Sequence, residues 1–286
     1  MTTAPSPSRT ARPANSVGPL LRGWRERRRV SQLELALRAG SSARHISFVE
    51  TGRSRPSEEL ILRLAGHLDV PVRERNALLI AAGYAPRFPE TPLDDPNLSA
   101  LRDGIERLLA GYEPYPALVV DATYDVLAAN RGIAMLMEGL PEDLLAPPLN
   151  AMRLTLHPRG LAPRILNLRA WRGHLLAQME RRMALERSDA LRAVYEEVAG
   201  YPVAAPGADG VAPEAAGAVD GDGPVDGAVP VFALPMRIAH DGRVLSFVSS
   251  ISTFNTPMDV TVAELAIETF LPADPPTAAY LRSLTP

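Results

Sequence analysis

The stretch SSARHISFVETGRSRPS, residues 41–57, decides the fold of the first third of the chain. Ser42 is typical of a helix N-cap, and Ile46 and Val49 lie three residues apart, so they face one side of the helix that follows. Gly52 predicts the end of this helix. Amphipathic packing alone does not explain the other residues, which are mainly polar or basic. We therefore expect a short helix with one buried face and one face that contacts another molecule.

Helical periodicity continues on both sides of this stretch. The segment SQLELALRAG, residues 31–40, predicts a helix that Ser31 caps. We expect another helix near Gly18 and two more helices after the quoted stretch. Two short helices joined by a turn that contains Gly, inside a small helical unit, are typical of a helix-turn-helix. The predicted fold of residues 18–84 is therefore an all-α, five-helix helix-turn-helix domain.

Charge divides unevenly along the chain. Residues 1–88 contain 15 Arg and 7 acidic residues, a net charge of +8, whereas the remainder contains 15 Arg and 26 acidic residues, a net charge of -11. A basic module followed by an acidic one is typical of a nucleic-acid-binding head on a body that does not contact nucleic acid. We therefore expect double-stranded DNA to be the partner of the first domain.

The helix over residues 42–51 is the expected recognition helix, whose N-terminal residues reach base edges in the major groove. Arg44 is suited to a bidentate contact with guanine, and Phe48 to a thymine methyl group. His45 suits a phosphate better than a base, and Glu50 is expected in an ion pair with a neighbouring Arg because DNA repels it. Gln32 and the Arg residues after the helix are placed for phosphate oxygens. The predicted DNA-binding residues are Gln32, Ser42, Ala43, Arg44, His45, Phe48, Arg53 and Arg55.

The pattern changes after a connector rich in Pro and Asp, residues 85–97. LSALRDGIERLLAGY predicts a linker helix whose Leu-rich face is the expected dimer seam, with Leu101, Ile105, Leu108 and Leu109. PALVVDATYDVLAAN predicts two strands around a tight bend. Two further strands meet at an Asp-Gly dipeptide that favours a hairpin, and TVAELAIETF, residues 261–270, predicts a final helix. Residues 98–286 are therefore expected to form an α+β domain with one antiparallel sheet.

Two segments contain too few apolar residues to join a core. Residues 1–17 predict a disordered arm, and residues 203–230, rich in Gly, Ala, Pro and Asp, predict a flexible insertion. No run approaches the roughly 18 apolar residues that a membrane span needs, and the first residues lack the apolar region of a secretory signal. We expect a cytoplasmic, nucleoid-associated protein with no membrane partner.

Several dispersed motifs carry a resemblance to known proteins. SQLELALRAG, SSARHISFVETGRSRPS and LRLAGHLDVP resemble the Xre-type helix-turn-helix repressors, with the lambda-repressor-like fold. Together with RERNALLIAAGYAP, PALVVDATYDVLAANR, PLNAMRLTLHPRGLAPRILNLRAWRGHLL and DVTVAELAIETFLPAD, their order resembles the MmyB-like transcription regulators. The resemblance covers most of the chain. It implies a DNA-binding head joined to a PAS-like ligand-binding domain. Because one short recognition helix reads only a few base pairs, we expect the regulator to bind its operator as a homodimer.

The resemblance directs attention to possible ligand contacts in the second domain. Asn150, Arg153 and His157 lie three and four residues apart in NAMRLTLHP, on one face if this segment is helical, although the Pro that follows favours a turn. Arg153 suits a carboxylate or phosphate head group, and His157 could add a donor. With Trp171 these three are the predicted ligand-binding residues, and a small amphiphile such as a fatty acid is implied. The candidate apolar lining is Met135, Met137, Leu149, Met152, Leu154, Trp171, Phe247 and Phe254.

Other functions have weaker support. The chain has no Cys, its five His show no metal-ligand spacing, and it contains neither a Gly-x-Ser-x-Gly elbow nor a phosphate-binding Gly loop. We expect no catalytic residue, no metal and no cofactor. Arg153 and His157 could instead tie helices to loops at the surface. The alternative function is a DNA-binding scaffold whose second domain only dimerises and binds no ligand.

Overall fold

The computed structural model describes residues 17–185, 188–202 and 233–284. The predicted arm, apart from its last residue, and the whole of the predicted insertion lie outside these residues. The chain divides into two compact units: residues 1–90 with 257–263, and residues 91–256 with 264–286. Each unit is described by itself.

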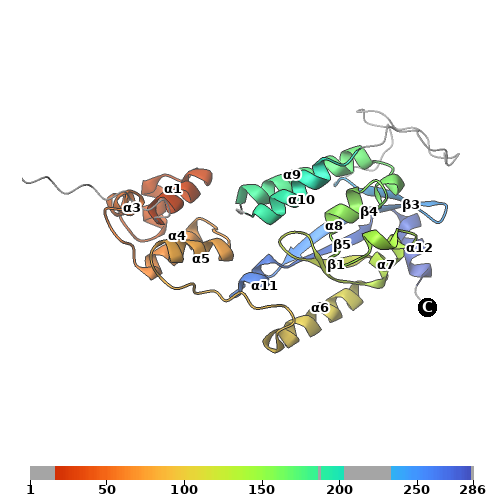
Figure 1. Ribbon diagram of the computed structural model, residues 1–286, viewed down its shortest axis with the longest axis horizontal. Coiled ribbons are helices and arrows are strands. Elements are labelled where there is room, and N and C mark those ends of the chain that lie inside the picture. The colour runs from red at the N-terminus through yellow and green to blue at the C-terminus, as the bar shows by residue number, and fades with distance from the viewer. Residues whose placement is uncertain (1–16, 186–187, 203–232, 285–286) are drawn as a thin grey trace, which may run out of the picture. The chain divides into compact units, whose positions relative to one another are not determined.

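Five helices form the described part of the first unit along residues 17–90 (Figure 1). They are α1 (Val17–Arg27), α2 (Gln32–Arg38), α3 (Ala43–Glu50), α4 (Glu58–His67) and α5 (Val72–Ala81). Ser31, Ser42 and Ser57 cap α2, α3 and α4, because each side chain accepts a hydrogen bond from the backbone N–H three residues later. The predicted five-helix fold and the predicted N-caps Ser31 and Ser42 are confirmed.

The core of this unit holds α3 in place. Ile46 and Val49 of α3 are almost completely buried, together with Leu21 and Trp24 of α1. The helices α1 and α3 approach closely at Gly18, where an added Cβ would lie 2.5 Å from the carbonyl oxygens of two α3 residues. The small size of this glycine therefore sets how α3 lies on α1.

The described part of the second unit contains a five-stranded antiparallel sheet with strand order β2-β1-β5-β4-β3. Its strands are β1 (Ala117–Val120), β2 (Val126–Ala129), β3 (Met236–His240), β4 (Arg243–Thr253) and β5 (Ala266–Pro272). Asp241 and Gly242, both with positive φ, form the predicted turn between β3 and β4. The expected α+β class with an antiparallel sheet is confirmed.

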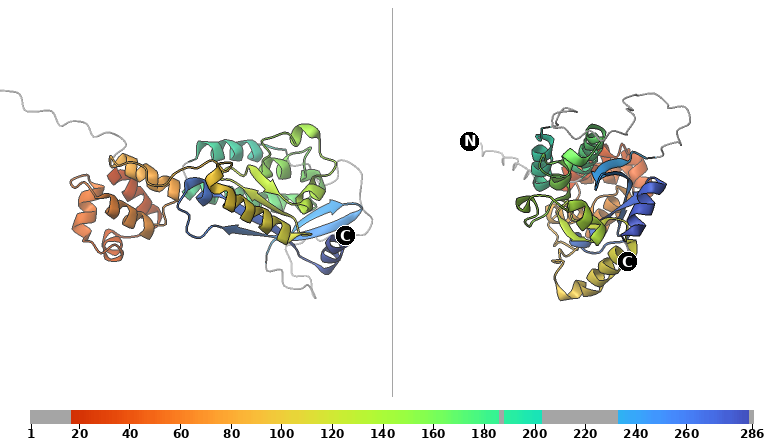
Figure 2. Two further views of the ribbon diagram at one scale, coloured as in Figure 1. Left: turned by 90° about the horizontal axis from the view of Figure 1, so that it is seen from below. Right: turned by 90° about the vertical axis from the view of Figure 1, so that its right-hand side faces the viewer.

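Helices cover both faces of this sheet (Figures 1 and 2). On one face α6 (Ser99–Tyr112) places Ile105 and Leu109 against β1 and β5. The other face is covered by α7 (Arg131–Met137), α8 (Ala151–Leu156), α9 (Leu168–Leu185) and α10 (Asp189–Ala199). A last helix, α12 (Pro275–Ser283), contacts β4 and β5. The described residues also include three short 3-10 turns, Pro96–Leu98, Glu142–Leu144 and Ala162–Arg164.

The predicted dimer seam is wrong for Ile105 and Leu109, because these side chains are buried against the chain's own sheet.

The predicted final helix over residues 261–270 is correct for residues 261–264 and wrong for the remainder. Residues Val260–Glu264 form a short helix, α11, and the chain then continues as β5, between β1 and β4. Ile267 packs on the α6 side of the sheet and Ala266 on the opposite side, so both faces of β5 are buried. A strand that is buried on both faces lacks the apolar and polar alternation that identifies strands, and its apolar run resembles a helix.

The segment between β4 and β5 belongs to the first unit rather than the second. Val260 of α11 is almost completely buried in a cluster with Val72 and Phe88, and its backbone N–H donates to the carbonyl oxygen of Pro89 at 2.8 Å. The chain therefore passes from the sheet into the first unit, contributes a buried residue there, and returns as β5.

Candidate functional site

The N-terminal end of α3 carries residues that are exposed to solvent. Ser42 and Arg44 at the N-terminal end are exposed, while Ala43, His45 and Phe48 are half-buried. Ser42 accepts a hydrogen bond from the N–H of His45 at 3.1 Å, so its hydroxyl is already used in capping the helix. The exposed N-terminal end of α3 thus presents one long cation, Arg44.

Two of the predicted DNA-binding cations, Arg44 and Arg53, contact the Phe48 ring. The guanidinium carbon of Arg44 lies 5.3 Å from the centre of the Phe48 ring, and that of Arg53 lies 5.9 Å from it. At these distances the ring attracts each cation by about 0.5–1 kcal/mol at an exposed site. The contact restricts both side chains while leaving their N–H groups available to an anion. We name Arg44, Phe48 and Arg53 the α3 cation cluster.

Glu50 forms the structural ion pair that the sequence predicts. Its carboxylate is buried and accepts hydrogen bonds from Arg25 Nε at 2.6 Å and Arg25 Nη2 at 3.0 Å. Gln32 Nε2 donates to the same carboxylate at 2.8 Å. An amide nitrogen carries two N–H donors, so this bond orients Gln32 and leaves a second N–H for a phosphate oxygen. The partner of Glu50 is 25 residues away in the chain, which sequence spacing alone does not reveal.

Arg55 lies on the turn after α3 and is exposed. Its guanidinium carbon is 5.0 Å from the centre of the Tyr84 ring, and Nη2 is 3.5 Å from the carbonyl oxygen of Gly83. The turn is therefore held against the end of α5 by Arg55. The roles of these residues at bases and phosphates stay predictions.

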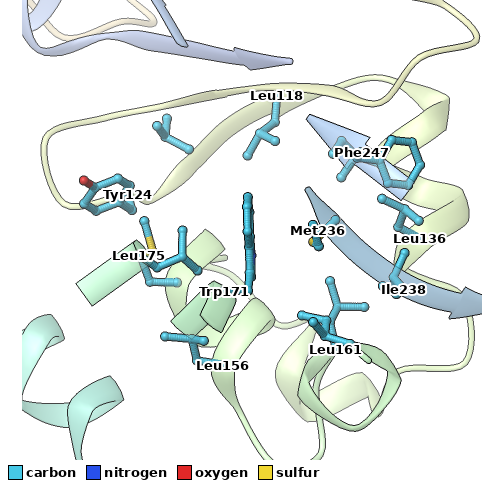
Figure 3. Packing of buried hydrophobic residues seen from close by; sticks show 14 of the residues in the cluster. Leu118, Tyr124, Leu136, Leu156, Leu161, Trp171, Leu175, Met236, Ile238 and Phe247 are labelled. Atoms are coloured by element: carbon cyan, nitrogen blue, oxygen red, sulfur yellow. The ribbon is translucent and has the colours of Figure 1, made fainter. Parts of the chain in front are cut away.

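A second candidate site is a cavity of about 70 Å³ on the face of the sheet that α7, α8 and α9 cover. Figure 3 shows Trp171 in the middle of the surrounding side chains, with Leu118 on its sheet side and Leu156 and Leu161 opposite. The lining residues are Leu118, Val126, Ile133, Leu136, Met137, Leu149, Ala151, Met152, Leu154, Thr155, Leu161, Trp171, Leu175, Met236, Glu268 and Phe270.

Five of the eight expected apolar residues line this cavity, and three do not. Met135 packs at the edge of the same core, and Phe247 is fully buried within it. Phe254 belongs to the cluster beneath the opposite face of the sheet. Trp171, also a predicted ligand-binding residue, is almost completely buried and stacks on His174 at 5.3 Å between ring centres.

The three predicted polar ligand contacts do not line the cavity. Asn150 is buried and caps α8, where its side chain accepts from the N–H groups of Met152 and Arg153. Arg153 forms an ion pair with Glu197 of α10, with Nη2 2.8 Å from Oε2. His157 meets the Tyr201 ring edge-on at 5.0 Å between ring centres. An anionic head group can reach Arg153 only in competition with Glu197, so these ligand contacts stay predictions.

Two groups near Arg153 have shifted pKa values. A hydrogen bond from Arg153 lowers the pKa of Glu197. Burial, together with a hydrogen bond to Glu197, raises the pKa of Tyr201 to about 12. Arg153 and Glu197 therefore connect α8 to the end of α10 near the surface. This is a structural role for Arg153, the alternative to ligand binding.

Sequence reasoning missed the two polar residues among the described residues that line the cavity, Thr155 and Glu268. Glu268 is the acidic one. It lies on β5, in the segment that was expected to be a helix, and its side chain points to the cavity side with that of Leu118, its cross-strand neighbour. Burial raises the pKa of Glu268, and the hydroxyl of Ser249 donates to its Oε1 at 2.8 Å. One feature of the sequence could have identified Glu268: it is an acidic residue within the apolar run AIETF.

The comparisons with known proteins agree with this geometry. The family model described as the MmyB-like transcription regulator ligand binding domain matches residues 101–284. The chain belongs to this family. A helix-turn-helix family model matches residues 21–75, and no individual curated protein matches the chain. The regulator thus has a DNA-binding helix-turn-helix head and a ligand-binding domain, and these domains are those of a transcription regulator rather than an enzyme.

The described residues contain neither a membrane-spanning helix nor a metal-binding cluster of acidic and His side chains. None of the helices described there is long and apolar enough to cross a membrane. The described part of the regulator also contains no group of three or more His, Asp or Glu side chains that could hold a metal ion.

Proposed function

We propose that the regulator binds a specific operator through α3 as a homodimer, and that a small amphiphilic ligand in the cavity modulates this binding. The α3 cation cluster is the observation that carries the DNA-binding part. Arg44 reads a guanine edge at the exposed end of α3, with Ala43 and Phe48 beside thymine methyl groups. Gln32, Arg53 and Arg55 hold the phosphate backbone, with Ser42 and His45 at the edge of the contact. Operator binding implies a cytoplasmic, nucleoid-associated location.

The number of base pairs that an operator-binding protein must read supports a homodimer. One short recognition helix reads few base pairs, and a two-fold symmetric dimer reads two half-sites about one helical turn apart. The surface of α6 that faces away from the sheet offers a shallow groove lined by Gly104, Arg107, Leu108, Gly111 and Tyr112. Leu108, one residue of the predicted seam, is 45% exposed there, so we place the dimer contact on this surface and not at the buried Ile105 and Leu109.

The ligand part of the proposal rests on the cavity. Its lining is almost entirely apolar, and Met137, Met152 and Met236 can change rotamer to admit a ligand larger than about 70 Å³. A small amphiphile fits this composition, and a fatty acid belongs to that class. Arg153 is the predicted partner of an anionic head group.

A route from ligand to DNA is supported by the chain's connectivity. Glu268 and Phe270 line the cavity from β5, and β5 begins two residues after α11 ends. Val260 of α11 is buried in the DNA-binding head. A ligand that prefers one arrangement of β5 thereby biases the position of α11, and it can shift operator affinity only through such a difference between states.

The experiment that tests this function has two parts. Selection of duplexes from a random DNA pool by the full-length protein would yield an operator with two symmetric half-sites. Mass spectrometry of small molecules released from the purified protein would identify a bound amphiphile. A protein that enriches no sequence contradicts operator binding, whereas enrichment without any bound or bindable small molecule supports the scaffold alternative.

The predicted role of Arg153 has its own test. With octanoate as the probe, Arg153→Ala should abolish the change in operator affinity while leaving DNA binding without octanoate intact. The matched control is Arg172→Ala, which removes a hydrogen bond to α10 from a different helix, α9, donated by Arg172 Nη2 to the carbonyl oxygen of Ala199 at 2.6 Å. An unchanged response to octanoate in Arg153→Ala removes Arg153 from the ligand site.

A further inference from the structure

One acidic residue, Glu268, lines a cavity whose other described lining residues are apolar except for Thr155. Glu268 lies at the middle of β5, opposite Leu118 of β1 on one side and Ile251 of β4 on the other. Its side chain is buried and lines the cavity together with Phe270. A carboxyl group costs several kcal/mol to bury without partners, so its place among Leu, Met and Trp side chains requires a reason.

Within the described residues the carboxyl has little compensation from the protein. The Ser249 hydroxyl donates to Oε1 at 2.8 Å, and Thr155 is the other polar side chain among the described lining residues. None of the described lining residues is basic, so the cavity contains no cation to neutralise an ionised Glu268 or an anionic ligand. Burial instead favours the protonated form of Glu268 by raising its pKa.

We propose that Glu268 and Ser249 form the polar recognition point of the ligand cavity, and that the group they bind is an uncharged hydroxyl on an otherwise apolar ligand. This inference rests on the proposed ligand-binding function and narrows its ligand class to neutral amphiphiles, in place of a fatty acid whose carboxylate meets Arg153. Ser249 occupies Oε1, which leaves Oε2 of Glu268 to meet the ligand. A protonated Oε2 donates to the oxygen of a hydroxyl, and that hydroxyl can in turn donate to a carboxyl or Ser oxygen.

The same geometry disfavours a carboxylate inside the cavity. A ligand carboxylate beside Glu268 would place two acidic groups together with no cation, and in an apolar site one of them must hold a proton at a free-energy cost. A hydroxyl loses less hydration on entering than a carboxylate does. The Glu268 and Ser249 pair therefore selects between an alcohol and an acid of the same chain length.

The test compares 1-octanol with octanoate by isothermal titration calorimetry of the full-length protein at pH 7. The wild type should bind 1-octanol at least about tenfold more tightly than octanoate. Glu268→Leu should weaken 1-octanol binding by about tenfold or more, and Glu268→Gln, which keeps a hydrogen-bonding group of the same shape, should retain most of it. Thr155→Val is the matched control at the other polar lining residue and should leave the preference unchanged.

Each outcome decides between the inference and the function on which it rests. Tighter binding of octanoate than of 1-octanol by the wild type overturns the hydroxyl assignment, and this comparison decides even if Glu268→Leu does not fold. Equal binding of 1-octanol by the wild type and a folded Glu268→Leu variant also overturns it, while leaving the cavity as a ligand site. A wild type that binds neither probe contradicts the ligand-binding proposal itself.

Discussion

Phe48 brings two cations to the exposed side of α3, and their roles in DNA binding are separable. Arg44 is at the end of the helix that would enter the major groove, so Arg44→Ala should weaken binding to the selected operator by about 1–3 kcal/mol and relax base preference at one position. Competition binding against operator variants measures both effects. Equal weakening on operator and random DNA would show that Arg44 contacts only phosphate.

Arg53→Ala is the matched variant in the same cluster. Its guanidinium group is on the turn after α3, where we predict a phosphate contact, so binding to all sequences should weaken alike. The slope of log K against log salt should become shallower by about one unit, because one fewer counterion is released. A salt slope equal to that of the wild type excludes this phosphate contact.

At Glu268 the raised pKa makes stability depend on pH in a defined direction. A carboxyl whose pKa is higher in the folded state stabilises the fold below its ordinary pKa, and this contribution is lost as pH rises through the folded-state pKa. Wild type should therefore lose stability relative to Glu268→Gln as pH increases above about 4.5. Urea unfolding at a series of pH values measures this difference. Parallel pH profiles of the two proteins would mean that Glu268 is not desolvated.

At the scale of elements, α1 and α3 depend on the absence of a side chain at Gly18. An added methyl group there meets two carbonyl oxygens at 2.5 Å, so Gly18→Ala should destabilise the head by about 1–3 kcal/mol. Gly66→Ala is the control, because this glycine of α4 has no atom within 4 Å of an added Cβ and alanine favours helix by about 1 kcal/mol. Chemical denaturation should show opposite signs for the two variants, and destabilisation by both would contradict the close-contact explanation.

The elements that sequence predicted well are those with local signals. Ser31, Ser42 and Ser57 are N-cap residues that mark where helices of the head begin. The Asp-Gly dipeptide predicts the β3–β4 hairpin. The element that sequence missed is β5, whose identity depends on the strands and helices that cover both its faces. Tertiary burial rather than local preference decides such a strand.

The same distinction applies to the candidate sites. The exposure of Arg44 and the burial of Ile46 follow from helical spacing, so the surface of α3 could be predicted. The partners of Arg153 and Glu50 come from residues 44 and 25 positions away, and Glu268 reaches the cavity only because β5 joins the sheet. Contacts of this kind require the three-dimensional fold.

At the scale of the whole molecule, α11 is the described segment through which the second half of the chain enters the DNA-binding head. Val260→Ala should remove packing against Val72 and Phe88 and reduce the effect of ligand on operator affinity, while operator binding without ligand is retained. The control is Val262→Ala on the same helix, a half-buried residue outside this cluster. Operator titrations with and without 1-octanol measure the effect. A full ligand response in Val260→Ala would exclude α11 as the link.

The most direct test of the account is the dissociation constant of the selected operator, measured by fluorescence anisotropy with and without saturating 1-octanol. The account predicts a change of about fivefold or more, and an equal change in the affinity for 1-octanol when operator is bound, because coupling between two sites is reciprocal. Identical dissociation constants with and without 1-octanol bound in the cavity would contradict ligand control of operator binding.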